Sequence, residues 1–141
     1  AASDVYKRQI VADRENFRLQ IFDLEGNYID QWHLHHPMSV TEGKNGDKNL
    51  YIGEMGPPDV QIGVRGLGNR IVVLSPEGKK IDSFGHGLPG QNDDQIVATH
   101  GLTTDTKGKV YVGEVAWTFW GSKQNPQPLG ELISLRKWIK K

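Results

Sequence analysis

The sequence predicts an all-β fold that is built from repeated antiparallel units, and three observations carry this prediction. Short apolar runs with strand-like alternation recur along the chain, as in Leu50–Glu54 (LYIGE) and Val110–Glu114 (VYVGE). Glycine and proline, with 17 and 7 copies among 141 residues, supply frequent turns. Carboxylates return at the ends of the apolar runs, and such internal repetition is a firmer guide to architecture than any local pattern.

The first unit is centred on Ile10–Asp23, whose sequence is IVADRENFRLQIFD. Its apolar runs predict two strands around a polar turn, followed by a tight turn and a third strand. In chain order we expect a strand at Ile10–Ala12, a turn at Asp13–Phe17, a strand at Leu19–Phe22, a turn at Glu25–Asn27 and a strand at Tyr28–Trp32.

The second unit contains four predicted strands and a Gly/Pro-rich insertion at Gly56–Gly68. Ser75–Gly78 (SPEG) places proline and glycine where a hairpin turn needs them. The strands are expected at Met38–Thr41, Leu50–Ile52, Arg70–Leu74 and Lys79–Phe84, and the turn Glu42–Asn49 joins the first two.

The third unit follows a loop at His86–Thr99. A helix is the alternative to a strand at its end, because Leu135, Trp138 and Ile139 also fit a helical stripe. The expected elements are strands at Leu102–Thr104 and Val110–Val112 around the turn Asp105–Gly108, an irregular segment at Trp117–Gly130 and a closing strand at Ser134–Ile139.

The spacing of the units indicates a propeller. Asp13 and Glu54 lie 41 positions apart, within the roughly 40–50 residues of a four-stranded blade. Glu54 and Glu114 lie 60 positions apart, and the excess falls in two Gly/Pro-rich loops. Because each blade buries its faces only against neighbours, a closed ring of about 4–8 blades is expected. Ile10–Lys141 would then hold one half blade, one full blade and one blade without its outer strand, about half of a ring.

The first nine residues are treated apart from this pattern. Asp4–Gln9 (DVYKRQ) matches the translation of a transposon end that is used in sequencing libraries. We therefore expect Ala1–Gln9 to be a non-native leader and Ile10–Lys141 to be the partial propeller. On this interpretation the chain is a C-terminal fragment, and any signal peptide was lost with the residues upstream.

Composition argues against several classes of function. The 17 Lys and Arg balance the 17 Asp and Glu, so the chain lacks the basic surplus that binds nucleic acid or anionic membranes. Cysteine is missing, which removes disulfides and thiolate metal sites but leaves the redox compartment open. No apolar run approaches the roughly 18 residues of a membrane span.

Charged residues that recur at one repeat position are most simply explained by folding. Three acids each end an apolar run, and we expect them to accept hydrogen bonds from backbone amides of the following turn. A general acid/base role is the less favoured alternative. Three arginines each come just before or at the next strand and are expected to pair with acids of the neighbouring turn. The acids are Asp13, Glu54 and Glu114, and the arginines are Arg18, Arg70 and Arg136.

Arg14 breaks the repeat, because Met55 and Val115 stand at the matching positions. A side chain that the repeat does not need, at a strand end where propellers place their central loops, is a functional candidate. The alternative is a surface arginine paired with Glu15.

The histidines give a weaker pattern. His33, His35 and His36 cluster in an irregular segment, but a zinc site usually needs three protein ligands, and these lack a convincing spacing. His36 and His100 are expected to share one repeat position, where the simplest role is a hydrogen bond at the start of a strand.

Two motifs resemble a known family. VADREN-x-R-x-Q-x-F at Val11–Phe22 and H-G-L-x-x-D-x-x-G-x-V-Y-V-G-E at His100–Glu114 resemble NHL-repeat six-bladed β-propellers. Within that group the chain looks like the peptidyl-α-hydroxyglycine α-amidating lyases (peptidylamidoglycolate lyases) and their bacterial relatives. The likeness covers essentially all of Ile10–Lys141. It implies a carbon–nitrogen lyase that splits a peptidyl-α-hydroxyglycine, or a related α-hydroxy amide, into an amide and glyoxylate.

The resemblance also implies a site. Arg14 falls on the family's active-site arginine, and His100 falls on the last of three histidines that hold a zinc ion at the centre of the propeller. The other two histidines and a catalytic tyrosine would precede Ile10, so the fragment itself is expected to be inactive. Gly101 stands where the family has an aspartate that serves a structural calcium, which leaves calcium in doubt.

The resemblance favours a secreted or periplasmic location and a full-length protein that is monomeric. It implies a small-molecule or peptide substrate. The balanced charge and the lack of a long apolar run, not the resemblance, predict no nucleic-acid partner and no membrane span. Two alternatives stay open. One is a non-catalytic NHL-repeat binding propeller, and the other is a lactonase-type propeller hydrolase that holds a divalent metal through carboxylates.

Overall fold

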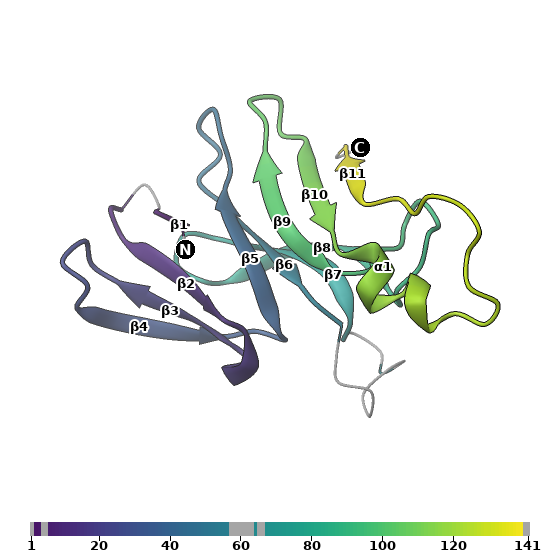
Figure 1. Cartoon of the computed structure of the whole chain (residues 1–141). Helices are drawn as coiled ribbons and strands as arrows, with labels where there is room; N and C mark the ends of the chain where they lie inside the picture. Colours follow the sequence, from purple (N-terminus) through teal and green to yellow (C-terminus); the bar gives the residue numbers. More distant parts are fainter. Residues whose placement is uncertain (1, 4–5, 57–63, 65–66, 140–141) are drawn as a thin grey trace.

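The computed structural model describes residues 2–3, 6–56, 64 and 67–139. The fold is all-β, as the sequence predicts, and consists of three small antiparallel sheets (Figure 1). The insertion predicted at Gly56–Gly68 lies largely outside the described residues. No helix in the described part of the chain is long and apolar enough to cross a membrane.

The first sheet has the strand order β1-β2-β3-β4. The predicted strands of this unit are confirmed, but the half blade expected from them is a four-stranded sheet. Two segments of the expected leader take part, because Ala2 pairs with Ile10 and Gln9 pairs with Phe22. The elements are β1 (Ala2–Ser3), β2 (Gln9–Asp13), the 3-10 turn η1 (Arg14–Asn16), β3 (Arg18–Phe22) and β4 (Tyr28–His33).

The second sheet has the order β5-β6-β7-β8 and contains the four strands that the sequence predicts. The hairpin turn between the last two strands forms as expected. Gly78 adopts a φ of +84°, which favours glycine, and its amide donates to the Ser75 oxygen at 2.9 Å. The strands are β5 (Pro37–Glu42), β6 (Leu50–Glu54), β7 (Asn69–Leu74) and β8 (Lys80–Gly87).

The third sheet has three strands in the order β11-β10-β9. The helical alternative for Ser134–Ile139 is wrong, because Arg136 pairs with Val112 in an antiparallel ladder. The predicted irregular segment Trp117–Gly130 begins inside a short helix and holds a 3-10 turn. The elements are β9 (Thr99–Thr104), β10 (Val110–Glu114), α1 (Ala116–Phe119), η3 (Gly121–Lys123) and β11 (Leu135–Trp138).

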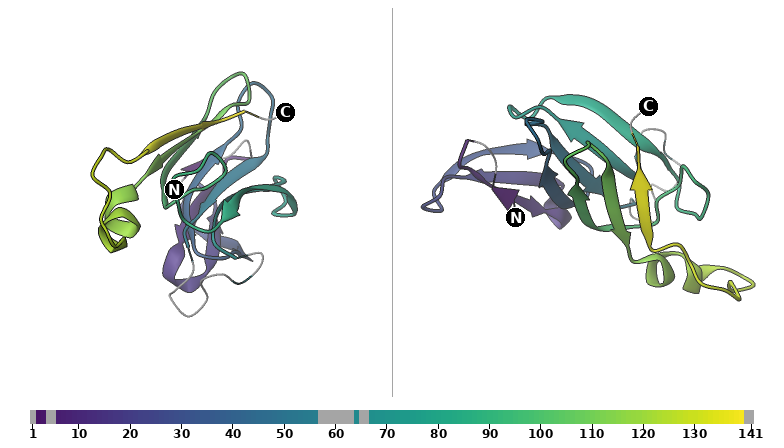
Figure 2. Two further views of the ribbon diagram at one scale, coloured as in Figure 1. Left: turned by 90° about the vertical axis from the view of Figure 1, so that its right-hand side faces the viewer. Right: turned by 90° about the horizontal axis from the view of Figure 1, so that it is seen from above.

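The three sheets pack side by side, and their faces form the core (Figures 1 and 2). β5 contacts both β2 and β9, whereas the outer strands β4 and β8 are mostly exposed. Because the apolar faces are buried only against a neighbouring sheet, each sheet depends on the next for stability. The buried cluster between the first two sheets is Ile10, Leu19, Leu50, Ile52, Val72 and Leu74. The cluster between the second and third sheets is Ile71, Ile96, Val110 and Val112.

One repeated polar motif ties a strand end to the connection that leads into its sheet. In the second sheet, Glu54 is the last residue of β6, and its carboxylate accepts a hydrogen bond from Arg70 Nε at 2.6 Å. The other carboxylate oxygen accepts the backbone amide of His35 at 3.0 Å. Since His35 precedes β5, Glu54 binds both the neighbouring strand and the chain that enters the sheet. We call this arrangement the strand-end clamp.

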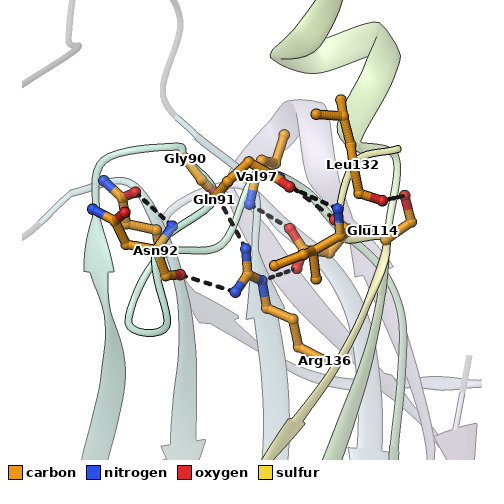
Figure 3. A network of polar contacts seen from close by, with 10 residues as sticks. Gly90, Gln91, Asn92, Val97, Glu114, Leu132 and Arg136 are labelled. Carbon is orange, nitrogen blue, oxygen red and sulfur yellow. Dashed lines mark hydrogen bonds and ion pairs between the residues drawn. The ribbon is translucent and has the colours of Figure 1, made fainter. Parts of the chain in front are cut away.

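The third sheet repeats the strand-end clamp (Figure 3). Glu114 ends β10 and accepts hydrogen bonds from Arg136 Nε at 2.6 Å and from the backbone amide of Val97, which precedes β9. Arg136 also donates to the backbone oxygens of Asn92 and Gly90, at 2.9 and 3.2 Å. One guanidinium and one carboxylate therefore hold a long connection against the sheet.

The clamps confirm one prediction and correct another. The recurrent acids do pair with the recurrent arginines. The backbone donors to Glu54 and Glu114, however, lie before the sheet and not in the turn that follows the acid, and Asp13 accepts from the side chains of Arg18 and Asn16. The reason is the antiparallel register: Glu54 pairs with Pro37 and Glu114 pairs with Thr99, so each acid lies beside the chain that enters its sheet.

The first sheet holds a more exposed version of the pair. Asp13 accepts hydrogen bonds from Arg18 Nε at 2.8 Å and from Asn16 Nδ2 at 2.9 Å. These bonds, that of Arg18 first, lower the pKa of the Asp13 carboxyl. The side chains of Arg18 and Asp13 are 29% and 24% exposed, whereas those of Arg136 and Glu114 are 6% and 0% exposed. Solvent therefore screens the first pair and not the third.

We expect Arg136→Met to lower the free energy of unfolding by about 3–5 kcal/mol, because it leaves the buried Glu114 carboxylate without its counter-charge. Arg18→Met is the matched control and should cost about 0–1 kcal/mol, since its ion pair with Asp13 is open to water. Urea denaturation followed by circular dichroism measures both. Equal losses would show that burial does not set the contribution of the pair.

Candidate functional site

The two predicted site residues lie at the same edge of the stacked sheets. Arg14 opens η1 directly after β2, and His100 is the second residue of β9. β2 ends at the edge where β5 and β9 begin, which is the lower edge in Figure 1. The structure thus places Arg14 and His100 on one side of the molecule, with the second sheet between them.

The guanidinium of Arg14 reaches from the first sheet to two methionines of the second unit. Its Nη1 lies 4.0 Å from the Sδ of Met38 and 4.0 Å from the Sδ of Met55. Its Nε donates to Glu15 Oε1 at 2.7 Å, so the pairing that was the alternative to a functional role is present. Glu15 is 71% exposed, and such a pair contributes little to folding. The Nη groups have no oxygen acceptor among the described residues and are therefore open to an anion.

Met38 is the extra residue of a β-bulge at the start of β5. Its neighbours Pro37 and Ser39 pair with Glu54 and Gly53 of β6, and Met38 has no partner between them. A bulge of this kind bends the strand and redirects one side chain, and bulges are common beside functional sites. The Met38 thioether is redirected toward Arg14.

His100 is the extra residue of the corresponding bulge in β9. The residues on either side of it pair with Glu114 and Gly113 of β10. The structural counterpart of His100 is therefore Met38, and the prediction that His36 and His100 share one repeat position is wrong. The residue pattern places the two histidines at one repeat position. The strand pairings instead match His36 with Ala98, two residues before His100.

The surroundings of His36 indicate a role in folding. Its ring is buried, its Nδ1 is bonded to the Gly56 oxygen at 3.0 Å, and it stacks on Phe17 at 5.3 Å between centroids. Its backbone oxygen accepts the amide of Met55 at 3.1 Å, as the oxygen of Ala98 accepts the amide of Val115 at 3.4 Å in the third sheet. The predicted role for His36, a hydrogen bond at the start of a strand, fits this position.

His100 is exposed, and its imidazole makes no hydrogen bond to any residue that the structure describes. Only its backbone is held, through an amide that donates to the Ala98 oxygen at 2.9 Å. An accessible imidazole on a fixed backbone is suited to bind a metal or to exchange a proton. Gly101 follows it, and a Cβ at that position would meet no neighbouring atom within 4 Å.

The other histidines do not complete a metal site with His100. His33 lies at the end of β4 with an exposed side chain, and burial lowers the pKa of His35, with the charges of His36 and Arg70 adding to the effect. Among the described residues, no group of three or more His, Cys, Asp or Glu side chains is placed to hold a metal ion.

No protein-family model matches this chain, and no curated protein matches it. The candidate site is consequently defined by the chain's own residues: a guanidinium whose Nη groups meet no oxygen acceptor among the described residues, two thioethers 4.0 Å from it, and an exposed imidazole in the third sheet. Sequence reasoning missed Met38 and Met55. The sequence pointed to Met55 only because it stands at the repeat position that matches Arg14. It did not point to Met38, because a residue pattern does not show where a strand will bulge.

Replacement of His36 and replacement of His100 should have different effects on the stability of the chain. We expect His36→Ala to lower the free energy of unfolding by about 1–3 kcal/mol, because it leaves the Gly56 oxygen without its partner and removes the ring from Phe17. His100→Ala should change it by less than about 0.5 kcal/mol, as expected for an exposed side chain. Thermal melts of both variants provide the measurement, and a larger loss for His100 would assign it a structural role instead.

Proposed function

We propose that this chain is part of a six-bladed NHL-type propeller and that the whole ring acts as a zinc-dependent lyase. Its substrate would be a peptidyl-α-hydroxyglycine or a related α-hydroxy amide, which it cleaves to an amide and glyoxylate. The three sheets are then three blades, Arg14 is the catalytic residue and His100 is one zinc ligand. One observation carries the proposal: Arg14 reaches the bulge residue Met38, and the same bulge position in the next sheet holds His100.

Arg14 differs from the three arginines of the repeat in what it binds. Arg18, Arg70 and Arg136 each donate Nε to the carboxylate at a strand end, where the fold uses them. Arg14 donates Nε to an exposed neighbour and directs Nη1 at sulfur atoms, which are weak acceptors. A guanidinium offers a planar fork of donors that matches a carboxylate, and the glycine-derived end of the proposed substrate carries one.

The methionines suit this role because they place no competing charge beside the guanidinium. A substrate carboxylate can therefore replace weak sulfur contacts and the exposed Glu15 without breaking a buried pair. Zinc, when bound, would supply acidification of the α-hydroxyl group, as it acidifies bound water. His100 contributes one ligand in this proposal, and the remaining ligands belong to parts of the ring outside this sequence.

The carboxylates weigh against the lactonase-type alternative. A hydrolase of that kind needs inward-facing acids that are free to hold a divalent metal. Here Asp13, Glu54 and Glu114 all bind arginines of their own sheets. A non-catalytic propeller would keep the clamps as they are and would not need the free guanidinium of Arg14.

The test uses a chain extended upstream to the whole ring and compares three alanine variants. Arg14→Ala should retain zinc and lower turnover by about 10²–10³-fold, the range for loss of one group that stabilises charge in the transition state. His100→Ala should lose both zinc and turnover. Arg18→Ala is the control for Arg14, because its guanidinium serves the sheet through Asp13 and Gln31, and it should leave turnover nearly unchanged.

Metal content by atomic spectroscopy and glyoxylate release report the two properties separately. Equal loss of turnover in Arg14→Ala and Arg18→Ala would remove the basis of the assignment. Full activity in His100→Ala would contradict the zinc role, and zinc binding without turnover in the unaltered ring would favour a binding propeller.

A further inference from the structure

We propose a second binding site, independent of the edge that carries Arg14: the cleft between the second and third sheets takes a small organic cation with apolar groups next to its charge. Its lining includes residues of the β5–β6 and β9–β10 turns, and these turns lie at the upper edge of Figure 1, opposite the edge where β2 ends. Its volume is about 620 Å³, a size typical of small-molecule sites.

Aromatic and aliphatic side chains make up most of the cleft wall. Phe84 of β8 and Trp138 of β11 both line it and pack on each other, with ring centroids 5.4 Å apart, and Tyr51 of β6 adds a third ring. Val110 and Ile139 extend the apolar surface. Aromatic faces attract cations through their quadrupole, and the attraction is strongest for alkylated ammonium ions that shed water readily.

Two carboxylates and one ammonium group supply the charge of the cleft. Asp47 accepts hydrogen bonds from the Tyr51 hydroxyl at 2.7 Å and from a backbone amide, so it is occupied. The pKa of Tyr51 is raised, mainly by burial. The hydrogen bond to Asp47 and the charges of Asp47 and Asp82 add to the effect. Lys107 lines the cleft from the turn after β9 but makes no ion pair with either acid in the part of the chain that the structure describes. The lining therefore carries a net negative charge.

Comparison with the first sheet shows that Asp82 lacks a hydrogen-bond donor that its counterpart has. Asp30 of β4 and Asp82 of β8 hold matching places, and each Oδ1 accepts the next residue's amide at 2.8 Å. In the first sheet, Asp30 Oδ2 also accepts the indole N–H of Trp32 at 3.1 Å. The counterpart of Trp32 is Phe84, which has no N–H to donate. Asp82 Oδ2 consequently has no donor among the described residues and faces a cleft instead.

In the first sheet, a cation lies beside the aromatic ring that corresponds to Phe84. Arg8 lies with its guanidinium carbon 5.7 Å from the centre of the Trp32 ring and donates to the Pro76 oxygen at 2.7 Å. It thus bridges the aromatic ring of the first sheet and the β7–β8 turn of the second. Between the second and third sheets, Phe84 and Asp82 line the cleft, and no cationic side chain of the described residues lies over the Phe84 ring. A cation from solution would pair with Asp82 there.

The test is titration calorimetry of the 141-residue chain at low salt with choline and with 3,3-dimethylbutanol, its neutral isostere. Both probes have the same shape, so the difference in affinity isolates the charge. We expect choline to bind about tenfold more tightly than the alcohol. Equal affinities, or no detectable binding of choline, would overturn the proposal. So would binding of a lysine-rich peptide without binding of choline.

Two variants place the binding in this cleft. Asp82→Asn keeps the Oδ1 acceptor for the Ser83 amide but removes the charge, and it should abolish the preference for choline over the alcohol. Asp93→Asn is the matched control, an exposed acid in the loop before β9, and should retain the preference. Phe84→Leu should weaken both probes while circular dichroism stays unchanged. Equal effects of Asp82→Asn and Asp93→Asn would show that choline responds to overall charge and not to the cleft.

Discussion

The strand-end clamp is the interaction on which the rest of the structure depends. The sheets are small and bury their apolar faces only against one another, so the connections between them must be held in place. A buried carboxylate is costly unless its charge and its lone pairs are satisfied. Glu54 and Glu114 meet both needs with one arginine and one backbone amide each. The two amide bonds join residues that are 19 and 17 positions apart, and the two arginine bonds join residues that are 16 and 22 positions apart. The motif therefore positions whole sheets.

The clamp and the bulge lie next to each other in both units. The clamp acid pairs with the first residue of the entering strand, Pro37 or Thr99, and the next residue of that strand forms the bulge. Met38 and His100 are those residues. The features that serve the sheet are identical in the two units, and the bulge position is where the units differ. A repeated scaffold thus presents different side chains at one edge without loss of its own contacts.

Much of this architecture could be predicted from residue patterns. Alternation located the strands to within a few residues, and recurrence identified the pairs of acid and arginine. The amide donors could not be found, because they lie in the connection before the sheet and only the folded register brings them to the acid. The equivalence of His36 and His100 failed for a related reason: residue identity favoured aligning the two histidines, and only the strand pairing shows that Pro37 matches Thr99 and that Met38 matches His100. Arg14 was singled out as the arginine that the repeat does not need, and its methionine contacts were not foreseen.

Amide hydrogen exchange at His35 and Val97 tests the strand-end clamp most directly. Both residues lie in connections outside the strands, where unbonded amides exchange quickly. If the carboxylates of Glu54 and Glu114 hold them, both amides exchange as slowly as those inside β6 and β10. Exchange as fast as that of the exposed loop residues Asp93 and Asp94 would contradict the account, because the connections would then be anchored by something other than the clamp.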